Sequence, residues 1–120
     1  MFEDWDEWIR SLKKDSKEKL ILVEGKKDKK ALTMLGIRPE AIITLKGKAM
    51  FKIVEEIVDY GKECIILFDL DKKGKELYAE ISKLLRRFGI KVDNRYRNFL
   101  FKTKLRQIEG ILHYLKTIEA

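Results

Sequence analysis

The sequence has few of the residues that build cysteine- or histidine-based sites. Its 120 residues include one cysteine, Cys64, and one histidine, His113. A single cysteine excludes a disulfide within the chain, and zinc sites built from thiolates need several cysteines. A catalytic metal would therefore have to be bound by carboxylates, which favours a hard cation such as Mg²⁺. We expect Cys64 to be a small core residue, and His113 to be a surface or packing residue away from the motifs described below.

Neither a secretory leader nor a membrane-spanning run is expected from the sequence. The first eight residues, MFEDWDEW, are acidic, whereas a secretory signal begins with basic residues followed by an apolar run. No apolar run approaches the roughly 18 residues that a membrane-spanning helix needs. We therefore expect a cytoplasmic protein that has no membrane partner.

Charged residues are abundant and unevenly distributed. They make up 39% of the chain, and the formal net charge is +7. The stretch from Lys72 to Arg106 contains twelve Lys or Arg and three Asp or Glu, so the basic surplus lies there. A basic face attracts polyphosphates through counterion release. Charge alone leaves two alternatives open, which are a nucleic-acid-binding surface and an ordinary solvated Lys-rich surface.

Short apolar runs alternate with amphipathic segments along the chain. Buried strands are predicted at residues 20–24, 41–45, 64–68 and, as a short fourth strand, 90–92. Helices are predicted at residues 3–15, 27–36, 49–60, 74–89 and 103–118. This alternation predicts an α/β fold, three-layered and Rossmann-like, with about four mainly parallel strands flanked by helices. The length of the chain fits one domain over residues 1–120.

Acidic residues follow two of the predicted strands. Glu24 ends the first strand, and Asp69 and Asp71 follow the third. The carboxyl ends of parallel strands lie on one edge of the sheet, and alternate residues of an extended segment point to the same side. Mg²⁺ binds one or two carboxylates together with water and substrate phosphate. A single acid after a strand is more often a helix cap, but three acids converging beside Gly25 and Gly74 favour a metal site.

The two glycines and the nearby lysines suggest phosphate binding at the same edge. Gly25 and Gly74 are expected to let the backbone turn sharply and open the following helices, whose N-termini favour a phosphate. Lysines that could contact phosphate, or that could be ordinary solvated residues, are Lys26, Lys27, Lys29, Lys30, Lys46, Lys48, Lys72, Lys73 and Lys75.

Basic and aromatic residues are interleaved later in the chain. They are Arg95, Tyr96, Arg97, Phe99, Phe101 and Lys102. Such a pattern is similar to a patch on which the bases of a single strand stack. We favour the alternative that the aromatic side chains pack against the last helix.

The two acidic motifs together resemble those of the Toprim family, the domain shared by topoisomerases, bacterial-type primases, OLD-type nucleases and RecR-type repair proteins. The first motif, LILVEGKKDKKAL, contains Glu24, Gly25 and Asp28, and the second, CIILFDLDKKGKEL, contains Asp69, Asp71 and Gly74. A helix, a strand and a helix are predicted between the motifs, as in the family. The resemblance covers about residues 18–95, and the terminal helices are expected to pack on that core.

The whole chain is similar to the stand-alone small Toprim proteins, which in turn resemble the maturase of 5S ribosomal RNA, ribonuclease M5. This resemblance implies that Glu24 is a general acid or base and that Asp69 and Asp71, with Glu24, bind Mg²⁺ or Mn²⁺. It implies a metal-dependent nuclease acting on RNA or DNA. The sequence departs from the family at Phe68, where many members have Thr or Ser. Topoisomerases and primases need additional domains that these 120 residues do not include, so we expect this chain alone to be neither.

Other functions remain as alternatives. One is a non-catalytic Toprim module that binds nucleic acid and acts with a protein partner in DNA repair or RNA metabolism. The segment ILFDLD also resembles the first motif of haloacid dehalogenase-like phosphatases, but Gly-Thr usually follows there, whereas Lys72 and Lys73 follow here. A receiver-type phosphoacceptor would have its acidic pair after the first strand, where this chain has only Glu24.

Overall fold

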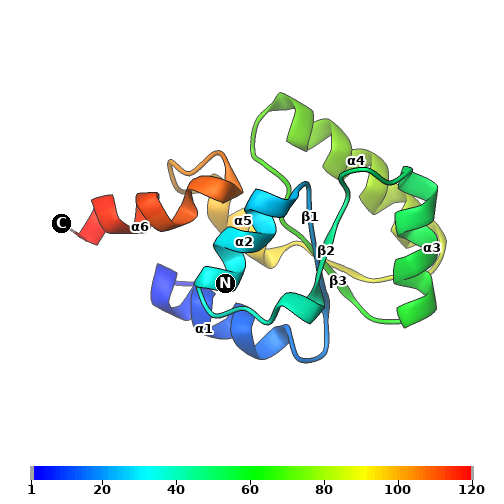
Figure 1. Ribbon diagram of the computed structural model, residues 1–120, viewed down its shortest axis with the longest axis horizontal. Coiled ribbons are helices and arrows are strands. Elements are labelled where there is room, and N and C mark those ends of the chain that lie inside the picture. Colours follow the sequence, from blue (N-terminus) through cyan, green and yellow to red (C-terminus); the bar gives the residue numbers. More distant parts are fainter. Residues whose placement is uncertain (1, 120) are drawn as a thin grey trace.

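A four-stranded parallel sheet separates two layers of helices in the structure, a computed structural model that describes residues 2–119 (Figure 1). The strand order is β2-β1-β3-β4, and every neighbouring pair is parallel. The strands are β1 (Leu20–Val23), β2 (Ile42–Thr44), β3 (Cys64–Ile66) and β4 (Val92–Asp93). This arrangement confirms the predicted three-layered, parallel α/β fold.

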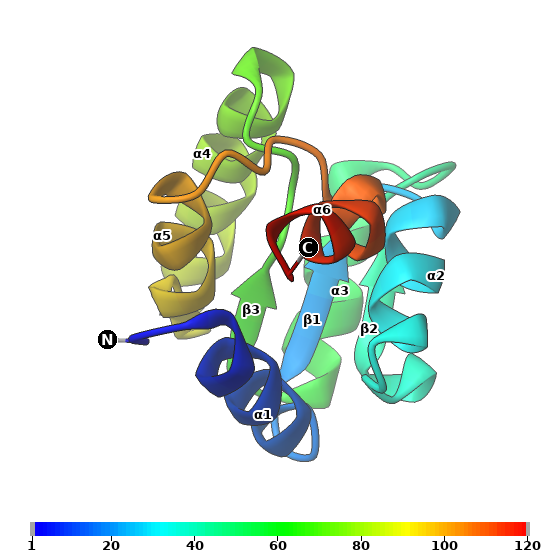
Figure 2. The ribbon, with the colours of Figure 1, turned by 90° about the vertical axis from the view of Figure 1, so that its left-hand side faces the viewer.

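The helices form two unequal layers. Figure 1 shows one layer to the right of the sheet, made of α3 (Met50–Tyr60) and α4 (Lys72–Arg87). The other layer, which faces the viewer in Figure 2, contains α1 (Trp5–Asp15), α2 (Lys26–Met34), α5 (Arg95–Phe101) and α6 (Ile111–Glu119). Two short 3₁₀ helices, η1 (Pro39–Ala41) and η2 (Ile108–Gly110), complete the chain. Within residues 2–119, no helix has both the length and the apolar character needed to cross a membrane.

The central strand β1 is apolar throughout because helices cover both of its faces. Ile21 and Val23 belong to the core beneath the α1, α2 and α5 layer, whereas Leu20 and Leu22 belong to the core beneath α3 and α4. All four side chains are buried. Full burial of such a side chain contributes about 1.5–3 kcal/mol, so each strand residue stabilises one of the two layers. This explains the continuous apolar run, which differs from the alternation of a half-exposed strand.

The C-terminal part of the chain differs from the prediction. The helix predicted at residues 103–118 begins only at Ile111, after a loop and η2. The apolar residues that suggested a longer helix, Leu105 and Ile108, are buried from the loop and from η2. The backbone N–H of Ile108 and the carbonyl oxygen of Arg106 bond to the segment after β3, so these residues are held in a non-helical path.

Residues 95–101 form a helix, α5, that was not predicted. Tyr96 and Phe99 on this helix are buried and contact Trp8 of α1, with ring centroids 5.9 and 6.4 Å apart. Aromatic contacts with α1 therefore hold α5 against the sheet. The preferred interpretation was that these aromatic residues pack against the last helix, but the contacts run mainly to α1.

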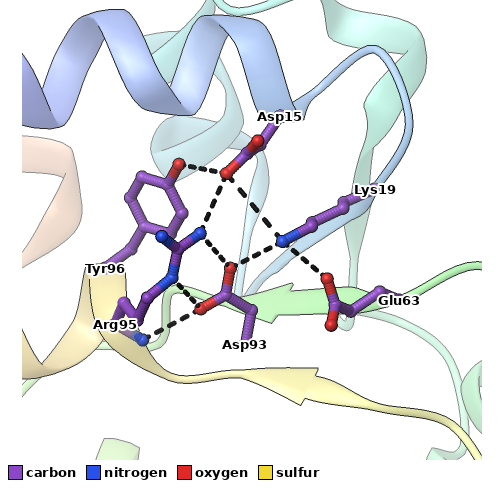
Figure 3. A network of polar contacts seen from close by, with 6 residues as sticks. All are labelled: Asp15, Lys19, Glu63, Asp93, Arg95 and Tyr96. Carbon is purple, nitrogen blue, oxygen red and sulfur yellow. Dashed lines mark hydrogen bonds and ion pairs between the residues drawn. The ribbon is translucent and has the colours of Figure 1, made fainter.

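A network of charged and polar side chains lies near the amino ends of strands β1 and β3 (Figure 3). It joins Asp15, Lys19, Glu63, Asp93, Arg95 and Tyr96. Asp93 is central to it, being 8% exposed, 2.9 Å from the Lys19 ammonium and bonded twice by the Arg95 guanidinium. Burial alone would raise the pKa of Asp93, but the hydrogen bonds from Arg95 and Lys19 outweigh it and hold that pKa well below its usual range.

Removing the charge of Asp93 tests this network. We expect Asp93→Asn to lower the free energy of unfolding at pH 7 by about 1.5–3 kcal/mol, because Arg95 and Lys19 lose hydrogen bonds to an ionised partner. The folded-state pKa is depressed, so the contribution of Asp93 is present above its unfolded pKa of about 4 and is lost as the pH falls below it.

Urea denaturation of parent and variant at pH 7 and pH 3 measures the effect. The difference between the two proteins should shrink at pH 3. Glu40→Gln is the control, because this side chain is largely exposed and its ion pair with Arg38 is long, at 3.9 Å. A variant as stable as the parent at pH 7 would show that the network does not stabilise the fold.

Candidate functional site

The chain changes direction across the sheet between β1 and β3. After β1 it passes through α2 to β2 on one side, and after α3 it returns to form β3 on the other side of β1. Such a reversal leaves a crevice beyond the carboxyl ends of the two strands. Glu24 directly follows β1, and Asp69 and Asp71 follow β3. Glu24 and Asp69 line this crevice, whereas Asp71 lines a neighbouring cleft.

The crevice is a cleft of about 730 Å³, here called the main cleft. Its walls contain four acidic residues, Glu24, Asp28, Asp69 and Glu109, and four lysines, Lys26, Lys27, Lys46 and Lys73. Opposite charges therefore share one cavity, which suits a site that binds both a cation and a phosphate.

Five of the nine lysines that could contact phosphate do not line the main cleft, namely Lys29, Lys30, Lys48, Lys72 and Lys75. Lys48 is 3.4 Å from Glu56 of α3, and Lys75 lies over the ring of Phe101. Charge and sequence position could not separate these residues from Lys46 and Lys73, since all of them are close to a motif.

Glu24 joins the ends of the two central strands. Its Oε2 accepts a hydrogen bond of 2.7 Å from the backbone N–H of Asp69. Burial raises the pKa of Glu24, and the nearby charges of Asp69 and Asp71 raise it further, against the opposing effect of the backbone bond. The carboxyl group is thus both fixed in position and easier to protonate than an exposed glutamate.

The two aspartates after β3 are held by different backbone groups. Asp69 Oδ1 accepts a hydrogen bond of 2.9 Å from the N–H of Ile108. Asp71 Oδ1 accepts one of 2.8 Å from the N–H of Gly74 and caps the N-terminus of α4. Burial and then the charge of Asp71 raise the pKa of Asp69, with the Ile108 bond opposing them. Asp71 is therefore a helix cap, and capping uses only one of its two oxygens.

Gly74 is needed for space and not for an unusual backbone angle. A Cβ atom at this position would lie 1.9 Å from the carbonyl oxygen of Asp69. Gly74 is the third residue of α4, and Gly25 has extended backbone with φ of −146°. The chain bends at Gly25 before α2 begins, whereas Gly74 lies within the first turn of α4, after the bend at Leu70 and Asp71. Because Gly74 has no side chain, the first turn of α4 packs directly against the backbone of Asp69 in the loop after β3.

Arg97 holds the loop after β3 that contains Asp69 and Asp71, here called the acidic loop. The sequence alone did not indicate this role. Arg97 is 2% exposed and donates hydrogen bonds to the carbonyl oxygens of Phe68 and Asp69. Its guanidinium lies 4.6 Å from the centre of the Tyr78 ring and 5.2 Å from that of Phe101. Burial lowers the pKa of Arg97, against the nearby acidic charges that raise it. Arg97 is thus part of the scaffold and cannot belong to an exposed base-stacking patch.

Two further acids and the histidine also lie near the motifs, and only the histidine differs from its expected place. Asp28 accepts a hydrogen bond of 3.0 Å from the N–H of Gly25, and burial followed by the charge of Asp69 raises its pKa to about 6. Asp28 was visible within the first motif, whereas nothing in the sequence marked Glu109, which reaches the main cleft from η2. His113 was expected to lie away from the motifs, but it lines a neighbouring cleft together with Asp71.

The donor set fits a hard divalent cation. One oxygen of each of Glu24, Asp69 and Asp71 is fixed by a backbone N–H, and the other accepts no hydrogen bond from residues 2–119. Among those described residues, no group of three or more Asp, Glu, His or Cys side chains is arranged to hold one ion. Mg²⁺ needs only one or two carboxylates and completes its shell with water and phosphate, so the acids present are sufficient.

Comparisons with known proteins agree with this geometry. The family model of the Toprim domain matches residues 19–99. A UPF0292 protein of Methanocaldococcus jannaschii is 36% identical over 118 residues, which cover 95% of this chain and 91% of that protein. Another UPF0292 protein, from Pyrococcus abyssi, is 38% identical over 91 residues, which cover 76% of this chain and 67% of that protein. A solved structure from Aquifex aeolicus is similar, with a TM-score of 0.85, 40% identity, and coverage of 91% of this chain and 99% of the other.

The close approach at Gly74 can be tested by adding one methyl group. We expect Gly74→Ala to lower the free energy of unfolding by about 2 kcal/mol or more, because the new Cβ meets backbone that cannot move aside without displacing Asp69. Gly110→Ala is the matched control, because a Cβ there meets nothing within 4 Å and its φ is not positive.

Urea denaturation of the two alanine variants gives the comparison. The control should stay within about 0.5 kcal/mol of the parent or become slightly more stable, as alanine restricts the unfolded chain. Equal stability of Gly74→Ala and the parent would mean that the Asp69 loop does not depend on this contact.

Proposed function

The chain belongs to the Toprim domain family, and from that premise we propose that it is a Mg²⁺-dependent nuclease that cleaves phosphodiester bonds in structured RNA or in DNA. Family membership places the chain among domains that process nucleic acids with the help of a divalent metal ion. The observation that carries the finer proposal is the hydrogen-bonded pair of Glu24 and Asp69, which opens into a cleft with four lysines. Such a cleft combines acidic groups for a cation with basic groups for a phosphate.

Asp69 and Asp71 are the residues that would hold the cation, with Glu24 beside them. A divalent cation bound there would neutralise charge on the phosphate and polarise the bond to the leaving oxygen. Arg97 keeps the loop of the two aspartates in place through its bonds to the carbonyl oxygens of Phe68 and Asp69.

The lysines of the main cleft would bind and orient the phosphates. Lys26 and Lys27 begin α2, Lys46 follows β2, and Lys73 lies in the first turn of α4. All four are exposed and approach the cavity from different elements. Lysines in the first turn of a helix are unfavourable next to the helix dipole unless an anion is bound, which supports a phosphate at this place.

Glu24 would move a proton during the reaction. Its Oε2 is held by the backbone N–H of Asp69, and this bond also restricts the rotation of the carboxyl group. Burial raises its pKa, so the group exchanges a proton more readily near neutral pH than an exposed glutamate would. Glu24 would accept a proton from the attacking water or return one to the leaving oxygen.

A second candidate function is nucleic-acid binding without cleavage. It is favoured by the finding that, in the described part of the chain, no three acidic side chains are arranged to bind one metal ion. In this alternative the lysines of the main cleft bind phosphate, and a protein partner supplies what catalysis needs.

A cleavage assay separates the two functions. The purified protein is incubated with end-labelled structured RNA and with DNA, with Mg²⁺, with Mn²⁺ or with chelator. We expect cleavage only with metal. Glu24→Gln should slow it by about 10²- to 10⁴-fold, because a general acid or base contributes that much, and Asp69→Asn/Asp71→Asn should abolish it by removing the metal ligands.

Glu55→Gln is the control variant, since this acid is exposed on α3 and does not line the main cleft. It should cleave at the parent rate. Tight binding by the parent without cleavage under any metal condition would reject the nuclease and favour the second candidate.

A further inference from the structure

A second cleft of about 450 Å³, here called the C-terminal cleft, lies next to Asp71. Apart from Asp71, the residues that line it follow the region matched by the Toprim model, which ends at residue 99. It includes Lys104, Arg106, His113 and Tyr114. The segment that forms it was predicted as one continuous helix, and the cleft exists because residues 102–107 form a loop instead.

We propose that the C-terminal cleft binds a single-stranded segment of nucleic acid that continues from the main cleft past the acidic loop. The inference rests on the proposed function, because it extends the substrate of the same site. Asp69 lines the main cleft and Asp71 lines the C-terminal cleft. The two aspartates, two residues apart, thus belong to different clefts, and a strand running from one cleft to the other would place one phosphate near the acids.

The wall of the C-terminal cleft is fixed to the acidic loop by backbone bonds. The N–H of Leu70 donates a hydrogen bond of 2.7 Å to the carbonyl oxygen of Arg106. The N–H of Ile108 donates one of 2.9 Å to Asp69 Oδ1. The fold therefore sets the distance between the loop of Lys104 and Arg106 and the two aspartates. A strand bound by this loop is then also positioned relative to the acids.

The charge of the C-terminal cleft suits the backbone of a nucleic acid. Lys104 and Arg106 are both exposed there, and Asp71 is the single acid among its described lining residues. One guanidinium nitrogen of Arg106, Nη1, bonds to the carbonyl oxygens of Thr103 and Leu105 at 2.9 and 2.7 Å. These bonds hold the group while its remaining N–H donors stay available for a phosphate.

Two rings indicate a single strand and not a duplex. Tyr114 is half-buried, packs at 5.8 Å from the Trp5 ring, and accepts a hydrogen bond of 3.3 Å from the Lys104 N–H, so its ring is held in the wall. His113 is exposed beside it. Unpaired bases stack on such rings with little sequence preference, whereas the bases of a duplex are already stacked on one another.

Binding measured by fluorescence anisotropy tests the inference. The probes are a labelled single-stranded oligonucleotide and the duplex of the same sequence, with chelator present so that nothing is cleaved. We expect Lys104→Gln/Arg106→Gln to bind the single strand about tenfold more weakly. The slope of log K against log salt should fall by about 1.4, since each lost phosphate contact removes about 0.7 from it.

Arg86→Gln/Arg87→Gln is the matched control, because it removes two exposed charges at the far end of α4 without touching either cleft. It should lose far less affinity than the double variant of the cleft.

The role of the rings is tested separately. Tyr114→Leu should weaken binding of the single strand several-fold, whereas Tyr114→Phe, which keeps the ring, should retain most of it. His113→Ala gives a second test at an exposed position where the fold is not disturbed. Thermal unfolding of each variant shows that losses of binding are not losses of folding.

The results distinguish this inference from the nuclease proposal. Equal affinity and salt slope for the parent and Lys104→Gln/Arg106→Gln would overturn the inference even if cleavage is found. Duplex binding as tight as single-strand binding, unchanged by Tyr114→Leu and His113→Ala, would overturn it as well. Binding that responds to these variants without any cleavage would support the inference and reject the nuclease. A parent that binds no nucleic acid would reject both.

Discussion

A hydrogen bond from the backbone N–H of Asp69 to the Glu24 carboxylate determines how the candidate site is built. It joins the ends of β1 and β3, which are neighbours in the sheet although 45 residues separate Glu24 from Asp69. The parallel pairing of the two strands brings their carboxyl ends to one edge, and the bond then fixes the two acids against each other. The contact at Gly74 and the bonds from Arg97 to the carbonyl oxygens of Phe68 and Asp69 hold the same loop from two other directions.

This arrangement places negative charges close together in partly buried positions. Burial and mutual repulsion raise the pKa values of Glu24, Asp28 and Asp69. Such crowding of negative charges is unfavourable in most folds. It is frequent at sites that bind a cation or transfer a proton. Arg97 is buried and does not line the main cleft, so its positive charge stabilises the loop without occupying the place of a cation. The exposed lysines supply the opposite charge on the side from which a phosphate would arrive.

The sequence was informative where structure depends on local pattern. Continuous apolar runs predicted β1, β2 and β3, because strands covered on both faces contain little else. Parallel strands end at the same edge of a sheet, so Glu24 and Asp69 are expected to lie there together. The Toprim resemblance added the identity of the motifs, and the domain match over residues 19–99 confirms the family.

The parts that could not be predicted depend on contacts between distant residues. Arg97 bonds to groups 28 and 29 residues away, and Tyr96 donates to Asp15 across 81 residues. Helix α5 has only seven residues, too few to show an apolar period, and its position is set by the aromatic side chains of α1. The loop before η2 follows an apolar pattern like that of a helix, and its bonds to the Asp69 loop override that pattern. Glu109 and His113 reach their clefts only because of this loop.

Diffraction from crystals soaked in Mn²⁺ would show whether the acids after β1 and β3 bind a divalent cation, as we propose. Mn²⁺ scatters anomalously and accepts the same oxygen ligands as Mg²⁺. We expect an anomalous peak at coordination distance from carboxylate oxygens of Asp69 or Asp71, next to Glu24, and no such peak in crystals of Asp69→Asn/Asp71→Asn. An empty acidic edge at saturating Mn²⁺, or a peak only at other residues, would contradict it.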